Sequence, residues 1–185
     1  MKPLICTIFS FLIVLNIHNT PLVAEEILDL EERITELSLL ASQGDSNAQF
    51  ELGQIALETR NPPDHSGAAY WFRIAAEANH IEAQVMLGAL LFSGMGVPLS
   101  HEEAYKWWKK AAFLGSMKAQ ASLGVLYGLG MGVNKNNIEA YKWLTIAAYF
   151  GNEEAQKQRD ESVSLQMSAD EIREAQKRIE ETIKI

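Results

Sequence analysis

Glycines are the residues whose spacing first suggests chemistry in this chain. Gly128, Gly130 and Gly132 alternate with apolar residues, as in loops whose backbone N–H groups hold a phosphate. Such a loop follows a strand and opens a helix, whereas these glycines follow a stretch of helical periodicity. We therefore interpret them, and the matching Gly94 and Gly96, as a turn between two helices.

The histidines and serines form no recognisable catalytic or metal-binding pattern. No two histidines have the four-residue helical spacing of a zinc site, and the sole cysteine, Cys6, lies in an apolar N-terminal segment. His65 and His101 stand one repeat apart, just after residues that cap helices. The nucleophile motifs Ser-x-x-Lys, Gly-x-Ser-x-Gly and Lys-Thr-Gly do not occur. The sequence therefore predicts no catalytic residue, no metal and no cofactor.

The elements that carry these residues recur with a period of 35 or 36 residues. Successive Ala-Gln pairs begin at Ala48, Ala83, Ala119 and Ala155, and successive Ala-Ala pairs begin at Ala75, Ala111 and Ala147. A period in this range indicates a stacked-repeat architecture. Each unit holds two helical patterns. The first has Ala and Leu four residues apart followed by Gly, which lets a neighbouring helix approach closely.

Helix-start signals agree with this period. Ser100 with Glu103, and Asn136 with Glu139, read as capping boxes at the start of the second helices, and Asp64 takes the same register. We predict an all-α fold, an α-solenoid of stacked antiparallel helix pairs. The predicted parts are a signal peptide at 1–24, an N-terminal capping helix at 25–44, repeats at 45–79, 80–115 and 116–151, and C-terminal capping helices at 152–185.

Aromatic residues at one register of the second helix are expected to fill the core of the repeats. They are Trp71, Trp107 and Trp143. Trp108 and its counterparts Phe72 and Leu144 are apolar too, which favours packing between units. Lys106, Lys109 and Lys110 form the densest basic cluster, and we interpret it as a solvated face.

The N-terminus has the pattern of a secretory signal. Lys2 precedes an almost unbroken apolar run from Leu4 to Leu15, and Ala24 offers a small residue for cleavage. The apolar stretch of about 14 residues is shorter than the roughly 20 that cross a bilayer. We expect export, with the periplasm as the destination and secretion beyond it as the other option, and no transmembrane segment after cleavage.

The net charge of the chain limits the classes of partner that it can bind. A net charge of -8 disfavours nucleic acid, whose phosphates require clustered Lys and Arg. In solenoids the first helices usually line the concave side, where residues that differ between units determine binding. Gln54, Met86 and Ser122 are our candidate partner-binding residues, and each could equally be buried in the core.

The recurring sequence motifs resemble those of the Sel-1-like repeat (SLR) family, which is related to the tetratricopeptide repeats. The pattern is Ala-x-x-x-Leu-Gly, then Gly-x-Gly-Val, then Ala-x-x-Trp-x-x-x-Ala-Ala-x-x-Gly, and it covers about residues 45 to 151. The resemblance implies an α-solenoid whose relatives act as adaptors in protein assemblies. A cysteine-rich branch is associated with β-lactam binding or hydrolysis, but its paired cysteines are absent here.

Three functional hypotheses follow. The first is an exported, non-enzymatic adaptor that binds a protein or peptide in the cell envelope through a solenoid groove. The alternative is a protein that binds or hydrolyses cell-wall peptides or β-lactams, as the cysteine-rich relatives suggest. The third is a passive structural module of a larger envelope complex. We expect a monomer or a weak homodimer.

Overall fold

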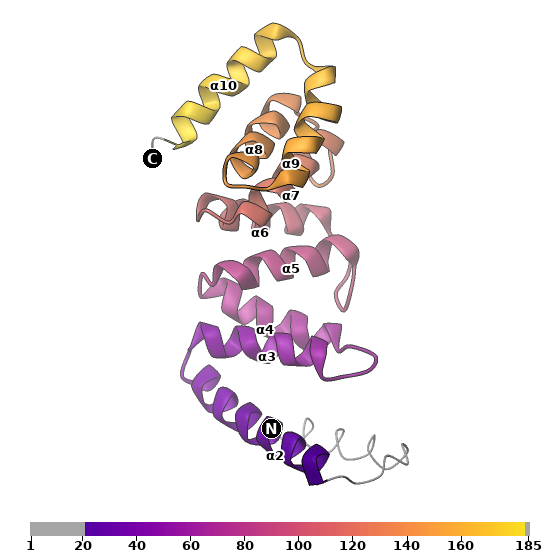
Figure 1. Cartoon of the computed structure of the whole chain (residues 1–185), viewed down its shortest axis with the longest axis vertical. Coiled ribbons are helices and arrows are strands. Elements are labelled where there is room, and N and C mark those ends of the chain that lie inside the picture. The colour runs from indigo at the N-terminus through magenta and orange to yellow at the C-terminus, as the bar shows by residue number, and fades with distance from the viewer. Residues whose placement is uncertain (1–20, 184–185) are drawn as a thin grey trace. The chain divides into compact units, whose positions relative to one another are not determined.

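The structure, a computed structural model, describes residues 21–183, and within that range it is helical without strands. The all-α solenoid prediction is confirmed (Figure 1). The helices are α2 (Pro21–Ser42), α3 (Ser46–Glu58), α4 (His65–Glu77), α5 (Ile81–Ser93), α6 (His101–Phe113), α7 (Met117–Leu129), α8 (Asn137–Tyr149), α9 (Glu153–Gln158) and α10 (Ala169–Ile183). Most of the expected signal peptide lies outside the described residues, and its last four residues begin α2.

The chain divides into two compact units, residues 1–36 and 37–185, with the boundary inside α2. The described part of the first unit is a single helical stretch in which Leu28 is exposed. The second unit contains the last turns of α2 and all later helices. Within it, α3 pairs with α4, α5 with α6 and α7 with α8, while α4 packs on α5 and α6 on α7. Each pair is one repeat, and neighbouring repeats are in contact.

The helix starts are capped where the sequence indicates, but the predicted boxes are only half formed. The Ser100 hydroxyl accepts from the Glu103 N–H at 3.2 Å. The Ser100 N–H does not need the Glu103 carboxylate, because it donates to the Leu91 carbonyl at 2.9 Å. The Asn136 N–H likewise donates to the Tyr127 carbonyl at 2.9 Å. These bonds connect the start of the second helix to the first helix of the same repeat. The predicted return bond from the N-cap N–H to the glutamate side chain is therefore absent at Ser100 and Asn136, and that part of the capping-box prediction was wrong.

The loop of the first repeat has a different conformation, but the N-cap N–H of its second helix makes the equivalent hydrogen bond to the first helix. It contains a cis Asn61-Pro62 peptide and an ion pair of 3.0 Å between Arg60 and Asp64. The Asp64 N–H nevertheless donates to the Ala56 carbonyl at 2.9 Å, as Ser100 does to its counterpart in the next repeat. The shorter loop therefore preserves the junction between the two helices.

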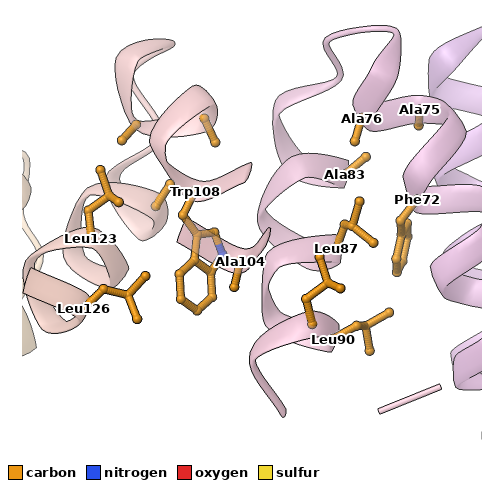
Figure 2. Packing of buried hydrophobic residues seen from close by; sticks show 14 of the residues in the cluster. Phe72, Ala75, Ala76, Ala83, Leu87, Leu90, Ala104, Trp108, Leu123 and Leu126 are labelled. Carbon is orange, nitrogen blue, oxygen red and sulfur yellow. The ribbon is translucent and has the colours of Figure 1, made fainter. Parts of the chain in front are cut away.

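In each repeat, a glycine on the first helix packs closely against a large side chain on the second helix. A Cβ atom added to the glycine would lie less than 3.0 Å from the facing side chain in three pairs: Gly53 with Phe72, Gly88 with Trp108, and Gly124 with Leu144. Figure 2 shows Phe72 and Trp108 among the buried residues of this core. These three contacts lie within a repeat. The core cluster that contains Phe72 and Trp108 includes residues of all three repeats, and their packing between units stays a prediction.

The tryptophan register chosen from the sequence is only partly buried. Trp143 is 3% exposed, whereas Trp71 and Trp107 are half-buried. Trp108, one residue further, lies in the core, and its indole N–H donates to the Val85 carbonyl at 3.0 Å. The prediction of a tryptophan core at the earlier register therefore holds for Trp143 and in part for Trp107, which packs against the core cluster while half-buried.

The Ala-Gln pairs join each repeat to the one before it. Each buried glutamine amide donates to the carbonyl of the alanine eight residues earlier: Gln49 to Ala41 at 3.1 Å, Gln84 to Ala76 at 3.2 Å, and Gln120 to Ala112 at 3.2 Å. Ala41 lies in the last turns of α2, within the second unit, and makes the contact that Ala76 and Ala112 of the second helices make. Gln156, the next residue in the series, is exposed.

The loop glycines also contact the preceding repeat. Gly96 has φ +70, and a Cβ there would collide with the backbone of His65 and Ser66 at the start of α4. Gly132 has φ +67 and approaches the start of α6 at His101 in the same way. A side chain at either position would push neighbouring repeats apart, which explains the glycine.

Candidate functional site

The three candidate binding residues lie on three successive first helices of the second unit. Gln54 is on α3, Met86 on α5 and Ser122 on α7, and all three are half-buried. Met86 packs against the main core cluster. The Ser122 hydroxyl donates to the Lys118 carbonyl of its own helix at 3.0 Å. Their role in binding stays a prediction, with part of each side chain accessible to a partner.

The register of Met86 and Ser122 changes its chemistry from repeat to repeat. The matching residue of the first repeat is Glu51, so the series runs from carboxylate to thioether to hydroxyl. The neighbouring positions Leu52 and Leu87 are buried and constant in type. A fixed scaffold thus presents a varied row of side chains, an arrangement suited to recognising an extended partner.

A tyrosine pair connects the second and third repeats. The hydroxyls of Tyr105 and Tyr127 are 2.9 Å apart. Burial, then the hydrogen bond with Tyr105 and the nearby charge of Glu139, raise the pKa of Tyr127 well above its usual value. Tyr127 therefore stays neutral and acts as a hydrogen-bonding group between α6 and α7. The repeat pattern gave no signal for this pair, because Tyr127 replaces an aliphatic residue, Leu91, at its register.

A charged cluster joins α10 to α8. Glu139 accepts from Lys142 at 2.7 Å and from Arg178 of α10 at 2.9 Å. Burial alone would raise the pKa of Glu139, but the hydrogen bonds from Lys142 and Arg178 and their positive charges outweigh it, so the pKa lies below its usual 4.5. The Lys142 ammonium also lies 4.6 Å from the centre of the Trp143 ring. The carboxylate is therefore ionised at neutral pH and serves as a contact between helices.

The basic cluster on α6 is exposed, as expected. Its members are Lys106, Lys109 and Lys110. Lys106 pairs with Glu102 at 2.7 Å, and the Lys110 ammonium lies 4.2 Å from the centre of the Trp107 ring. An exposed ion pair such as that of Lys106 with Glu102 contributes little to stability, which fits a solvated face.

The histidines of the second unit occupy helix starts. His80 caps α5, and its Nδ1 accepts from the Ala83 N–H at 3.1 Å. A contact of 3.6 Å between the same nitrogen and Glu82 is the weaker interaction, since an accepting Nδ1 carries no proton to share. Among residues 21–183, no group of three or more histidine, cysteine, aspartate or glutamate side chains is placed to hold a metal ion.

No helix within the described residues is long and apolar enough to span a membrane.

Known proteins resemble this chain in both sequence and structure. Residues 46–80, 81–116 and 118–152 match the family model described as the Sel1 repeat. A protective antigen of uropathogenic Escherichia coli with an SLR fold is 36% identical, with a TM-score of 0.64 over 68% of this chain. The match spans 27% of that antigen's chain, about a quarter of its length.

Two further solved structures are similar. A Sel1 repeat protein from Oxalobacter formigenes is 35% identical, with a TM-score of 0.62 over 69% of this chain and 96% of its own. Helicobacter pylori cysteine rich protein B is 22% identical, with a TM-score of 0.54 over 69% of this chain and 92% of its own, and it supports the fold alone. Comparison with curated proteins gives no match.

Proposed function

Because the chain belongs to the Sel1 repeat family, whose members are generally scaffolds for protein–protein interaction, we propose that it is an exported adaptor. It binds a protein or peptide partner in the cell envelope and catalyses no reaction. The partner lies across the first helices of the repeats and contacts Gln54, Met86 and Ser122.

The observation that carries this proposal is the variable row on the first helices. Glu51, Met86 and Ser122 share one register and remain partly accessible, while the leucine that follows each of them is buried. A partner in extended conformation meets a different side chain in each repeat, which gives specificity without changing the scaffold.

The polar side chains that could otherwise serve catalysis have structural tasks, which supports a scaffold. His80 and Ser100 cap helices, and the glycine-rich loops contact the preceding repeat. Export is supported by the apolar run from Leu4 to Leu15 and by Ala24. Export predicts that the mature protein in the envelope fraction begins at Glu25, which N-terminal sequencing checks.

Site-specific photocrosslinking in living cells tests the binding surface. A photoreactive residue replaces Met86 in one strain and Lys109, which is exposed on the second-helix side, in a control strain. We expect one protein to be crosslinked from position 86 and not from position 109. Equal crosslinking from both positions, or none from position 86, would contradict binding through the first helices.

A further inference from the structure

The first helices of the three repeats, and α9 after them, begin with the same hydrogen bond but with four different cap residues. The side chain of each cap accepts from the backbone N–H of the alanine three residues later. The pairs are Asp45 with Ala48 at 3.1 Å, His80 with Ala83 at 3.1 Å, Ser116 with Ala119 at 3.4 Å, and Asn152 with Ala155 at 2.9 Å. A carboxylate, a hydroxyl and an amide remain acceptors between about pH 8 and pH 5, whereas an imidazole takes up a proton near pH 6.5. One cap of the four is therefore sensitive to mild acid.

His80 stands at the junction between the first and second repeats and contacts both. Its backbone N–H donates to the Ala75 carbonyl of α4 at 3.0 Å. Its ring stacks on Phe50 of α3, with the ring centroids 4.6 Å apart and the planes inclined by 21°. Ala83, the alanine whose N–H it binds on α5, is fully buried and faces Ala76 of α4 (Figure 2). One side chain therefore touches the first repeat and fixes the start of the second.

A proton on Nδ1 removes the acceptor that the Ala83 N–H requires. It also places a positive charge at the start of α5, where the helix dipole favours a negative one. The two effects act in the same direction. In the protonated state, α5 therefore begins without a cap.

Glu82 offers the protonated ring a partner, but a weak one. Its carboxylate lies 3.6 Å from Nδ1 and its side chain is 69% exposed, so an ion pair there would contribute little. Among residues 21–183, it is the only acidic side chain in ion-pair range of the ring. Phe50 and the Ala75 carbonyl, the contacts of His80 on α3 and α4, carry no charge. The gain at Glu82 is therefore smaller than the loss of the cap.

We propose that His80 is an acid-sensitive joint between the first and second repeats. Above about pH 6.5 the neutral imidazole caps α5 and couples the two repeats. In milder acid than carboxylates require, the imidazolium releases the Ala83 amide, and the first repeat opens more readily from the rest of the array. The later junctions keep their caps, so acid acts at one junction only. The joint needs no partner protein, so this inference goes beyond the proposed adaptor function and can fail or hold without it.

Hydrogen exchange of the full chain, labelled with ¹⁵N, tests the joint at pH 7.5 and pH 5.5. Both values lie above the range in which Glu139 titrates, because its pKa is below 4.5. Each rate is divided by that of an unstructured chain at the same pH. We expect the protection of the Ala83 amide and of the slowest amides of α4 to fall about fivefold at pH 5.5, the effect of losing one cap. The protection of Ala119 and of α8 should stay unchanged.

Variants with a permanent cap separate the imidazole from other effects of acid. His80→Asn and His80→Ser introduce the cap residues that Asn152 and Ser116 provide at the same register, and both should abolish the response at Ala83. His101→Asn is the matched control. His101 is also half-buried and stacks on a phenylalanine, Phe92, at 4.8 Å, but the cap of its helix is Ser100. This variant should respond to acid as the wild type does.

Three results would overturn the inference. One is equal protection of Ala83 at the two pH values in the wild type. Another is a response that persists in both His80 variants. The third is a loss of protection that is as large in α8 as in α4, because acid would then weaken the whole array and not one junction.

Discussion

At the scale of single residues, the contact between Gly88 and Trp108 sets the distance between the two helices of the second repeat. The sequence indicated that this glycine allows a close approach, and the structure confirms it. The sequence did not identify the partner, because Trp107 and Trp108 are adjacent and equally apolar. One residue turns a side chain by about 100° around a helix. Only the way the two helices pack decides which indole enters the core.

Replacing this glycine should therefore destabilise the protein. In Gly88→Ala, the new Cβ would collide with the indole of Trp108 and disturb its bond to Val85. We expect a loss of about 1–3 kcal/mol in the free energy of unfolding, as for other overpacked cores. Urea denaturation followed by circular dichroism measures it.

Gly128→Ala is the matched control, because it lies in α7 and its added Cβ would have no neighbour nearer than 3.7 Å. There, alanine should stabilise the helix by about 0.4–1 kcal/mol. If Gly88→Ala and Gly128→Ala changed the free energy of unfolding equally, contact with Trp108 would not explain why position 88 is a glycine.

At the scale of elements, α10 was predictable as a helix but not in its placement. Its start is a complete capping box, since the Ser168 N–H donates to the Glu171 carboxylate at 2.8 Å and the Ser168 hydroxyl accepts from the Glu171 N–H at 3.3 Å. The repeat period gives no indication that α10 would lie on α8. The short α9 is followed by a π-helical turn at Arg159–Val163 and a 3-10 turn at Ser164–Gln166, which lead into α10.

The attachment of α10 should weaken in acid. The pKa of Glu139 is lowered in the folded chain, so its stabilising contribution is fully present above the ordinary value of 4.5 and is lost as the pH falls through the lower, folded value. Limited proteolysis at pH 7 and below pH 4, with a protease active at both, should show cleavage before α10 only in acid.

Glu139→Gln should release α10 already at neutral pH, at a cost of about 1–3 kcal/mol for the lost charged hydrogen bonds. Glu103→Gln, one period earlier on α6, should leave the cleavage pattern of the wild type unchanged. If acid or Glu139→Gln leaves α10 protected, the ion pair with Arg178 does not hold the helix.

At the scale of the whole molecule, the repeat period was sufficient to predict the fold class. Recurring alanines, glutamines and glycines appear in register because each repeat makes the same contacts, such as that of Gln84 with Ala76. The candidate binding surface was less predictable. Gln54, Met86 and Ser122 were chosen for their variation, but variation does not determine exposure, and each is half-buried.

The junction between repeats can be weakened without altering either repeat. In Gly96→Ala, the added Cβ would collide with the start of α4, so we expect reduced coupling between the first and second repeats. Hydrogen exchange should show faster exchange of amides in α3 and α4, with little change in α8. Gly115→Ala is the control, because Gly115 also has a positive φ of +91 but its Cβ would meet nothing within 4 Å. Equal loss of protection in both variants would assign the effect to backbone strain alone.

The glutamine bonds and the loop-glycine contacts between repeats reach backward along the chain. Gln84 reaches to Ala76, Gln120 reaches to Ala112, and the Gly96 loop reaches to His65. During synthesis on the ribosome, the docking surface for each new repeat is therefore complete before that repeat emerges. Each repeat can fold onto its predecessor as soon as its own helices leave the exit tunnel, without waiting for later residues. The order of translation is thus also an order in which this solenoid can assemble.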